Sequence, residues 1–168
     1  IDLVVETIRS GWLTTGPKVT EFENQLSKYL QYRAPLNSVG LNSCTSALFL
    51  SLLALEVGVG DEVLVPTWTF AATAQVVDWV GATVVLCDVE HDSLNLDLKI
   101  AESLITKKTK AIIPVHIAGY PCDMNGISRL AKKYNLKVIE DAAHAIGTKY
   151  GDQKIGNFSD VTCFSFYA

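Results

Sequence analysis

An aspartate and a histidine stand at the end of one strongly apolar segment. Residues 138–141 read Val-Ile-Glu-Asp, and His144 follows three residues after Asp141. An amphipathic helical pattern over 124–134 precedes this segment, which therefore reads as a buried parallel strand with polar side chains at its carboxyl end. Open α/β sheets bind ligands at that edge. An aspartate there, such as Asp141, can hold a fixed negative charge against a cationic ring nitrogen of a bound ligand. A capping aspartate beside a core histidine explains the same residues equally well, so the rest of the chain has to decide.

Residues 42–46 (NSCTS) follow a predicted short strand at 39–41 and begin a predicted helix. The first N–H groups of a helix have no internal partners, and the helix dipole favours an anion there. The hydroxyls of Ser43, Thr45 and Ser46 can add hydrogen bonds to a phosphate, although plain N-capping also accounts for the pattern. The glycine-rich fingerprints of dinucleotide sites and P-loops are absent from the sequence.

Phe70, His116 and Glu140 are three further candidates beside predicted strands. Phe70 begins a helix directly after a strand, where an aromatic ring can lie on a flat cofactor, but core packing explains it as well. His116 stands at another strand end, where a structural role is commoner than that of a catalytic base. Glu140 is expected on the opposite side of its strand from Asp141, as a solvated or hydrogen-bonded acid.

The composition excludes several classes of protein. Hydrophobic residues make up 49% of the 168 residues and charged residues 19%, as in a single α/β domain with a buried sheet. The net charge of −4 gives no basic surface, so nucleic acid is not expected as a partner. No apolar stretch is long enough for a bilayer and no signal-peptide pattern is present, so no membrane association is expected and the cytoplasm is the default location. The four cysteines form no CxxC pair, which argues against a metal site or a disulfide framework.

Strand and helix patterns alternate along the chain at βαβ spacing. This alternation predicts a mostly parallel sheet that is covered by helices on both faces. The predicted strands are 39–41, 62–65, 83–87, 111–115, 138–140 and 161–168. The predicted helices are 18–30, 44–57, 69–80, 97–105 and 124–134, with an amphipathic pattern over 1–9 and a Gly/Pro loop over 12–17. Asp97 and Asp123 are expected to cap the last two of these helices.

Taken in order, these segments resemble the DegT–StrS-type sugar aminotransferases, which are pyridoxal phosphate (PLP) enzymes of fold type I. The order of the motifs over essentially the whole chain carries the resemblance, and no single motif does. The matching segments are 11–17 (GWLTTGP), 42–48 (NSCTSAL), 60–63 (GDEV) with 65–66 and 69–70, 113–116 (IPVH), 140–144 (EDAAH) and 163–166 (CFSF).

The resemblance implies a three-layer α/β/α fold with a mostly parallel seven-stranded sheet, the PLP-binding large domain of fold type I. Residues 1–168 would form part of that domain, without the small C-terminal domain. The amphipathic start without an initiator methionine and the abrupt apolar strand at 161–168 agree with a piece of a longer protein.

The resemblance also implies which residues would contact the cofactor ring. Asp141 would pair with the pyridine nitrogen of PLP and keep it protonated. His144 would lie near the 3-hydroxyl of the ring, at a position that family members fill with Gln or His. Phe70 would stack on the ring.

The cofactor phosphate would be held at the start of the helix after residue 42. Thr45 and Ser46, with Ser43, would bind it, and Ser165 would add a further contact. Cys44 departs from the small Gly or Ala that is usual at its position, so the phosphate site is expected to be shifted rather than blocked.

The substrate implied by the resemblance is a nucleotide-linked keto-deoxysugar, with an amino acid, expected to be L-glutamate, as the amino donor. Residues 11–15, with Trp12, Thr14 and Thr15, would approach the sugar nucleotide. The full-length protein would be a homodimer with its site at the interface, acting in amino-sugar or cell-surface polysaccharide biosynthesis.

In the family, the pattern Ser-Phe-x-x-x-Lys supplies the lysine that forms the Schiff base with PLP. Counted from Ser165, that lysine would lie two residues beyond Ala168. Lysine there favours an aminotransferase, whereas histidine favours a PLP-dependent sugar dehydratase on the same scaffold. A non-catalytic, truncated or regulatory relative that binds PLP is the remaining alternative.

Overall fold

The computed structural model describes residues 1–31 and 37–167, in two compact units that divide after Leu41. The first unit contains helices α1 (Asp2–Ser10) and α2 (Pro17–Leu30), which confirms the amphipathic pattern over 1–9 and the helix predicted over 18–30. Helix α1 ends at Gly11, whose φ of 76° is the left-handed conformation that glycine adopts without strain. Pro17 opens α2 at a position where its missing N–H costs no hydrogen bond.

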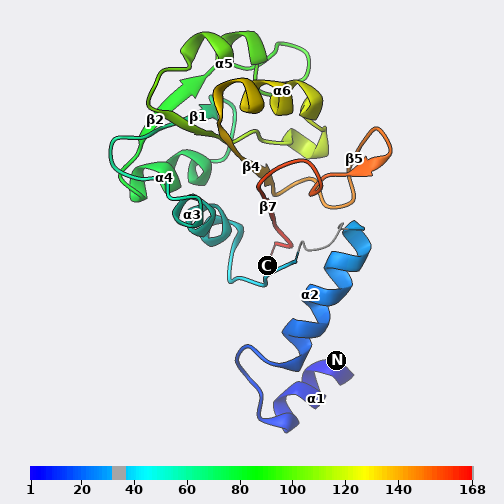
Figure 1. Cartoon of the computed structure of the whole chain (residues 1–168). Helices are drawn as coiled ribbons and strands as arrows, with labels where there is room; N and C mark the ends of the chain where they lie inside the picture. The colour runs from blue at the N-terminus through cyan, green and yellow to red at the C-terminus, as the bar shows by residue number, and fades with distance from the viewer. Residues whose placement is uncertain (32–36, 168) are drawn as a thin grey trace. The chain divides into compact units, whose positions relative to one another are not determined.

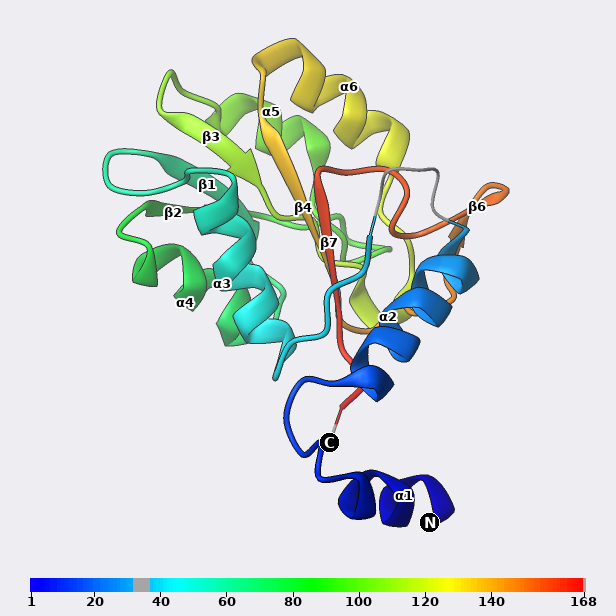
Figure 2. The ribbon, with the colours of Figure 1, turned by 60° about the horizontal axis from the view of Figure 1, so that its bottom comes forward.

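The second unit is built on a five-stranded sheet in the order β2-β1-β3-β4-β7, in which every neighbouring pair is parallel. Figure 2 shows β4 and β7 side by side in this sheet. The strands are β1 (Glu62–Pro66), β2 (Thr83–Cys87), β3 (Thr109–Ile112), β4 (Lys137–Ala142) and β7 (Val161–Phe164). Between β4 and β7 the chain forms a small antiparallel hairpin of β5 (Lys149–Tyr150) and β6 (Gln153–Lys154).

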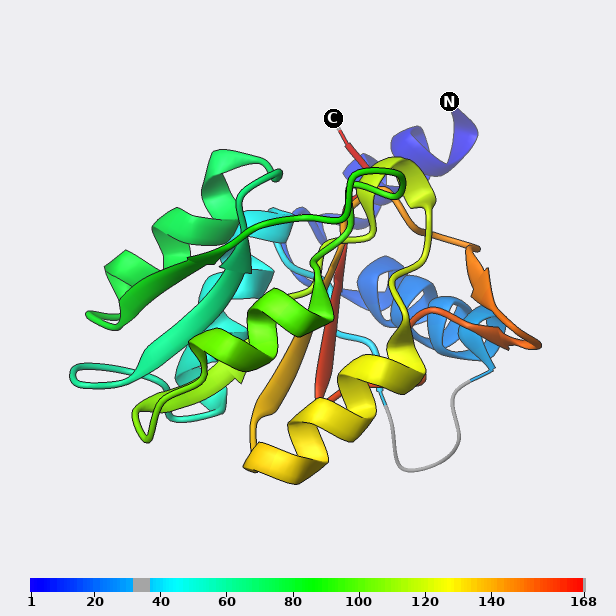
Figure 3. The same ribbon diagram turned by 90° about the horizontal axis from the view of Figure 1, so that it is seen from above.

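Helices cover both faces of the sheet, as the ribbon shows (Figure 1). Helices α3 (Cys44–Ala54) and α4 (Ala71–Trp79) pack on one face, and α5 (Leu98–Leu104) and α6 (Met124–Tyr134) on the other. Figure 3 looks onto the layer of α5 and α6. Successive strand residues alternate between the two cores: Val63 and Val65 of β1 face α3 and α4, while Leu64 faces α5 and α6.

The predicted three-layer α/β fold with a mostly parallel sheet is confirmed, but the sheet of the described residues has five strands rather than seven. The predicted strand at 39–41 is wrong, since these residues adopt no regular structure. A strand is stabilised by hydrogen bonds to a neighbouring strand, and no strand of the described chain pairs with this segment. The β5–β6 hairpin was not predicted, because two-residue strands are too short to show a hydrophobic period.

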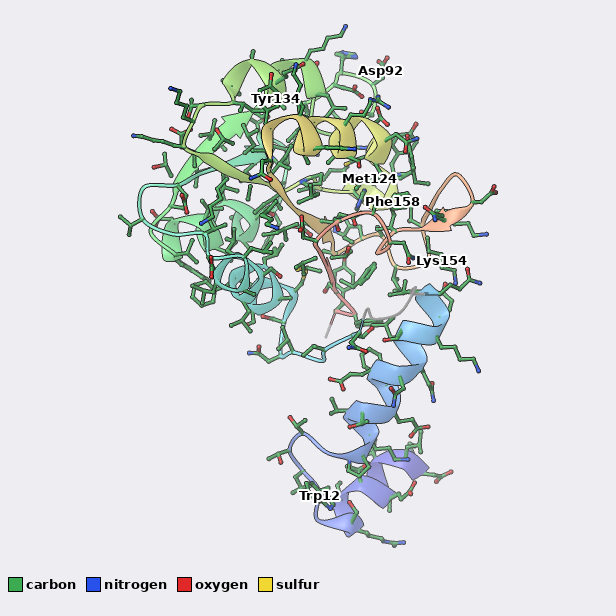
Figure 4. The ribbon with its side chains drawn as sticks, viewed as in Figure 1. Trp12, Asp92, Met124, Tyr134, Lys154 and Phe158 are labelled. Atoms are coloured by element: carbon green, nitrogen blue, oxygen red, sulfur yellow. The ribbon has the colours of Figure 1, made fainter. Side chains whose placement is uncertain are left out.

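Two of the helices begin at aspartates that cap them, as the sequence predicts. Asp97 accepts hydrogen bonds from the N–H groups of Lys99 and Ile100 at the start of α5. Asp123 accepts from the N–H of Gly126 at the start of α6, whose two ends Met124 and Tyr134 are marked in Figure 4. Among the described residues, no helix has the length and hydrophobicity that crossing a bilayer requires.

We expect Asp123→Ala to lower the free energy of unfolding by about 1–2 kcal/mol, because the first turn of α6 loses its side-chain cap and the Tyr150 hydroxyl loses its acceptor. Urea unfolding of the purified protein, followed by circular dichroism, measures this loss. Asp92→Ala is the matched control, since Asp92 is fully exposed and its carboxylate pairs with the equally exposed ring of His91. Equal stability of the two variants would contradict a capping role for Asp123.

Candidate functional site

Asp141 lies near the carboxyl end of β4, with 5% of its surface exposed. Its Oδ2 accepts a hydrogen bond of 2.8 Å from the hydroxyl of Thr73, and its Oδ1 accepts one of 3.2 Å from the N–H of Ala143. Within residues 1–31 and 37–167, no cationic side chain forms an ion pair with Asp141. A buried carboxylate held only by neutral donors keeps its attraction for a cation.

Helix α3 begins beside this carboxylate. The thiol of Cys44, its first residue, donates a hydrogen bond of 3.6 Å to the carbonyl of Cys163, and Cys163 is the register partner of Asp141 in the sheet. The predicted placement of this helix start, at the carboxyl edge of the sheet close to Asp141, is thereby confirmed.

Ser43 caps α3 in the way that the simpler interpretation of the sequence predicted. Its Oγ accepts a hydrogen bond of 3.0 Å from the N–H of Ser46 and donates one of 3.0 Å to the Ser46 hydroxyl. Ser46 therefore keeps its own hydroxyl proton for another acceptor. The N–H groups of Cys44 and Thr45 have no acceptor within the helix, as at any helix start, so the cap and an anion site are compatible here.

Phe70 is the N-cap residue of α4, four residues after the end of β1. Its side chain is 78% exposed, so core packing, the alternative explanation of this aromatic residue, is wrong. Thr73, which contacts Asp141, lies one turn further along the same helix. The first turn of α4 therefore presents an exposed aromatic ring and a hydrogen-bond donor at the carboxyl edge of the sheet.

His144 lies in the turn after β4, with an exposed ring. Its Nδ1 accepts a hydrogen bond of 3.3 Å from the N–H of Ala118, so a neutral His144 carries its proton on Nε2. The ring stacks on Tyr167, with centroids 6.3 Å apart and planes at 10°. Gly119 permits this arrangement, because a side chain there would place a carbon 3.0 Å from the carbonyl of His144.

Ser165 follows the end of β7 at the same sheet edge, where its Oγ accepts a hydrogen bond of 3.3 Å from the N–H of Tyr167.

Trp12, Thr14 and Thr15 are exposed in the loop between α1 and α2, where Trp12 is labelled in Figure 4. Trp12 and Thr14 line a cavity of about 330 Å³ within the first unit. The substrate-binding role of these three residues stays a prediction.

Glu140, next to Asp141, points into the opposite core, as predicted. It is completely buried and hydrogen-bonded rather than solvated. His116, also completely buried, accepts a hydrogen bond at Nδ1 from the N–H of Cys122, so its proton is on Nε2 and is donated to Glu140 at 2.8 Å. The hydroxyls of Ser159 and Thr162 donate to the other oxygen of Glu140 at 2.6 and 2.8 Å. This fully buried network explains His116 as a structural residue.

Thr73 is the contact that the sequence interpretation missed. The sequence feature that points to Thr73 is a single hydroxyl on the apolar side of a helix, three and four residues before the buried Val76 and Val77. Such a threonine is buried only with a hydrogen-bond partner, but the sequence does not show which partner it has.

A model of the DegT/DnrJ/EryC1/StrS aminotransferase family matches residues 1–168. The chain belongs to this family. It is 45% identical over 168 residues both to the spore coat polysaccharide biosynthesis protein SpsC of Bacillus subtilis and to the uncharacterized protein MJ1066 of Methanocaldococcus jannaschii. The alignments cover the whole chain but only 42% and 43% of those two relatives.

Solved structures of similar proteins have the same fold. The PLP form of the putative sugar aminotransferase Spr1654 from Streptococcus pneumoniae is 44% identical, with a TM-score of 0.91 over 98% of this chain and 45% of that one. DesV from S. venezuelae, in complex with a ketimine intermediate, is 37% identical, with a TM-score of 0.92 over 98% of this chain and 43% of that one. The chain thus spans less than half the length of these relatives.

We expect Glu140→Gln to lower the free energy of unfolding by about 2–3 kcal/mol, since three donors lose a charged acceptor in a buried site and the new amide adds donors of its own. Urea unfolding measures the change. Glu102→Gln is the matched control, because Glu102 makes its hydrogen bonds on the surface. A loss no larger than that of Glu102→Gln would contradict the buried network.

The raised pKa values of the two thiols beside the site predict that the free energy of unfolding depends on pH. Burial, aided by the charge of Asp141, raises the pKa of Cys44 from 9.0 to about 12, and burial likewise raises the pKa of Cys163 to about 12. The folded chain therefore keeps these thiols neutral, while the unfolded chain loses their protons above about pH 9. The free energy of unfolding is expected to fall as the pH rises from 9 toward 12.

Urea unfolding at a series of alkaline pH values measures this fall. Cys44→Ala removes one of the thiols and should flatten the curve between pH 9 and 11. An unchanged slope in this variant would show that Cys44 takes no part in the pH dependence.

Proposed function

We propose that the protein containing this chain is a PLP-dependent aminotransferase that transfers an amino group from an amino acid, L-glutamate by preference, to a nucleotide-linked keto-deoxysugar. The observation that carries the proposal is the buried carboxylate of Asp141, which has no cationic partner in the part of the chain that the structure describes and lies beside the start of α3. Membership of the aminotransferase family and the PLP form of the related Spr1654 support it.

The side chains around Asp141 have the chemistry that PLP requires. A protonated pyridine nitrogen needs a fixed negative charge, a flat ring needs an aromatic face, and a phosphate needs free N–H and hydroxyl donors. Asp141, the exposed Phe70 and the start of α3 offer these three features at one edge of the sheet. The donor set therefore fits the cofactor.

In this proposal Asp141 holds the proton on the pyridine nitrogen, and Phe70 covers one face of the ring. The Nε2–H of His144, which the hydrogen bond from Ala118 to Nδ1 leaves unused, would be available to the 3-hydroxyl. When bound, PLP supplies the electron sink on which amino transfer depends.

The phosphate would be held by Thr45 and Ser46, with Ser43 fixing the geometry of the turn as its cap. Ser46 is suited to this role because its hydroxyl proton is not used by Ser43. Ser165 would reach the phosphate from the end of β7. The side chain of Cys44 donates to Cys163, away from the N–H groups of the helix start, so it leaves them accessible.

The sugar nucleotide would contact Trp12, Thr14 and Thr15 in the loop of the first unit. The cavity of about 330 Å³ there is lined by Trp12 and Thr14, which offer an aromatic face and a hydroxyl, and by Lys18, whose charge is paired with Glu6 and Glu21. The name of the B. subtilis relative SpsC, a spore coat polysaccharide biosynthesis protein, supports a sugar substrate. We also propose a cytoplasmic homodimer as the active form, on the basis of the sequence resemblance.

We expect Asp141→Asn, made in the full-length protein, to lower the rate of amino transfer about 10- to 100-fold and to reduce activity far more than it weakens folding, although the amide group will face one of the two donors at this site. The amide has nearly the same shape but no charge, and a charge-assisted hydrogen bond contributes about 1.5–3 kcal/mol. Single-turnover rates with glutamate and a nucleotide-linked ketosugar, together with thermal unfolding, measure both quantities.

His144→Asn is the matched comparison and should cost less, because it affects the ring hydroxyl rather than the charge at the nitrogen. Near-wild-type turnover by Asp141→Asn would reduce Asp141 to a structural residue and remove the main support for the proposed function.

A further inference from the structure

Thr73 joins two parts of the candidate site that come from different places in the chain. It is completely buried in the first turn of α4, and its hydroxyl donates to Oδ2 of Asp141 on β4 at 2.8 Å. Phe70 stands one turn earlier on the same helix. This single hydrogen bond therefore links the helix that carries the exposed aromatic ring to the strand that carries the acid.

The order of protons in this cluster follows from the chemistry of its members. The proton of Thr73 is committed to the carboxylate, so its oxygen is the acceptor in the 2.7 Å contact with the hydroxyl of Thr69. Thr69 must then be the donor, and the hydroxyl protons run from Thr69 to Thr73 to Asp141. A donor whose own oxygen accepts a hydrogen bond is polarised and donates more strongly.

The bond also decides which part of the carboxylate remains free. Oδ2 accepts from Thr73 and Oδ1 from the N–H of Ala143, so the two donors fix the rotation of the carboxyl plane. Each oxygen keeps one further lone-pair direction. The remaining acceptor positions therefore point in directions that Thr73 and Ala143 set together.

We propose that Thr73 is a positioning residue for the cofactor ring: its hydroxyl orients the Asp141 carboxylate toward the pyridine nitrogen. The proposal rests on the proposed function, in that it takes PLP as the ligand of Asp141. It assigns to Thr73 a role in the protonation of that nitrogen and not in the transfer of protons to substrate.

The test uses the full-length protein loaded with PLP that carries ¹⁵N at the pyridine nitrogen. Thr73→Val removes the hydroxyl at almost constant shape, Thr73→Ser keeps it, and Asp141→Asn gives the response expected when the charge is lost. The measurements are the ¹⁵N chemical shift of the ring, the dissociation constant of PLP and the thermal midpoint of the protein without PLP.

We expect Thr73→Val to move the ¹⁵N signal toward the unprotonated pyridine, in the direction of Asp141→Asn, and to weaken PLP binding about tenfold. Thr73→Ser should keep the wild-type signal and affinity. A purely structural role would lower the thermal midpoint but would leave the ¹⁵N signal of the loaded protein in place.

An unmoved signal in Thr73→Val, with a moved signal in Asp141→Asn, would overturn the role of Thr73 and leave the proposed function standing. Unmoved signals in both variants would overturn the proposed function itself. If Thr73→Val does not fold, Thr73→Ala takes its place, since alanine favours the helix and fits within the same space.

Discussion

The burial of the Asp141 carboxylate, which no cation of the described residues pairs with, is the constraint on which the arrangement of the second unit depends. Desolvating a charge is costly unless hydrogen bonds replace the lost water. Asp141 obtains them from Thr73 on α4 and from the N–H of Ala143 in the turn after β4. Helix α4 and this turn must therefore keep their positions relative to β4, and that requirement gives the sheet edge a defined shape.

Strand β4 carries two neighbouring acids that face opposite sides of the sheet and differ in burial and in their hydrogen-bond donors. Glu140 faces the α5 and α6 side, where His116, Ser159 and Thr162 together provide three donors and enclose it completely. Asp141 faces the α3 and α4 side with two donors and retains a small exposed area at the sheet edge. An enclosed acid with three donors has no access to a ligand and acts within the fold, whereas an acid with two donors at an accessible edge is able to bind one.

The two faces of β4 are also connected through the backbone. His116, whose side chain donates to Glu140, has its N–H bonded to the carbonyl of Asp141 at 3.1 Å. Its chain continues into the turn whose Ala118 N–H reaches His144. The buried pair of His116 and Glu140 thus helps to hold two of the residues proposed to contact PLP, although neither member of the pair lies at the site.

The similarity to relatives shows the family of the chain, and the local geometry shows how its candidate site is arranged. Family membership rests on the match over residues 1–168 and on identities of up to 45%. The arrangement of Thr73, Asp141 and the start of α3 rests on distances within this chain. The alternative interpretations of the sequence, a cap at Ser43 and core packing of Phe70, had different outcomes: the cap exists alongside the candidate site, and the packing does not exist.

The sequence by itself determined the features that depend on neighbouring residues. The alternation of apolar runs and amphipathic helices predicted a parallel sheet between helical layers, and Ser43, Asp97 and Asp123 were recognisable as residues that begin helices. These signals are local, because a hydrophobic period and a cap act within a few residues. The candidate residues Asp141 and His144 were found for the same reason, at the end of one apolar strand.

Only the tertiary structure decided which distant residues meet. The 68-residue separation between Thr73 and Asp141 leaves no local pattern, and their contact depends on how α4 packs on the sheet. The segment at 39–41 has an extended, apolar sequence but forms no strand, because strand formation needs a partner that the segment itself does not specify. Hydrogen bonds between separate elements decide both outcomes, and such bonds exist only once the elements have packed.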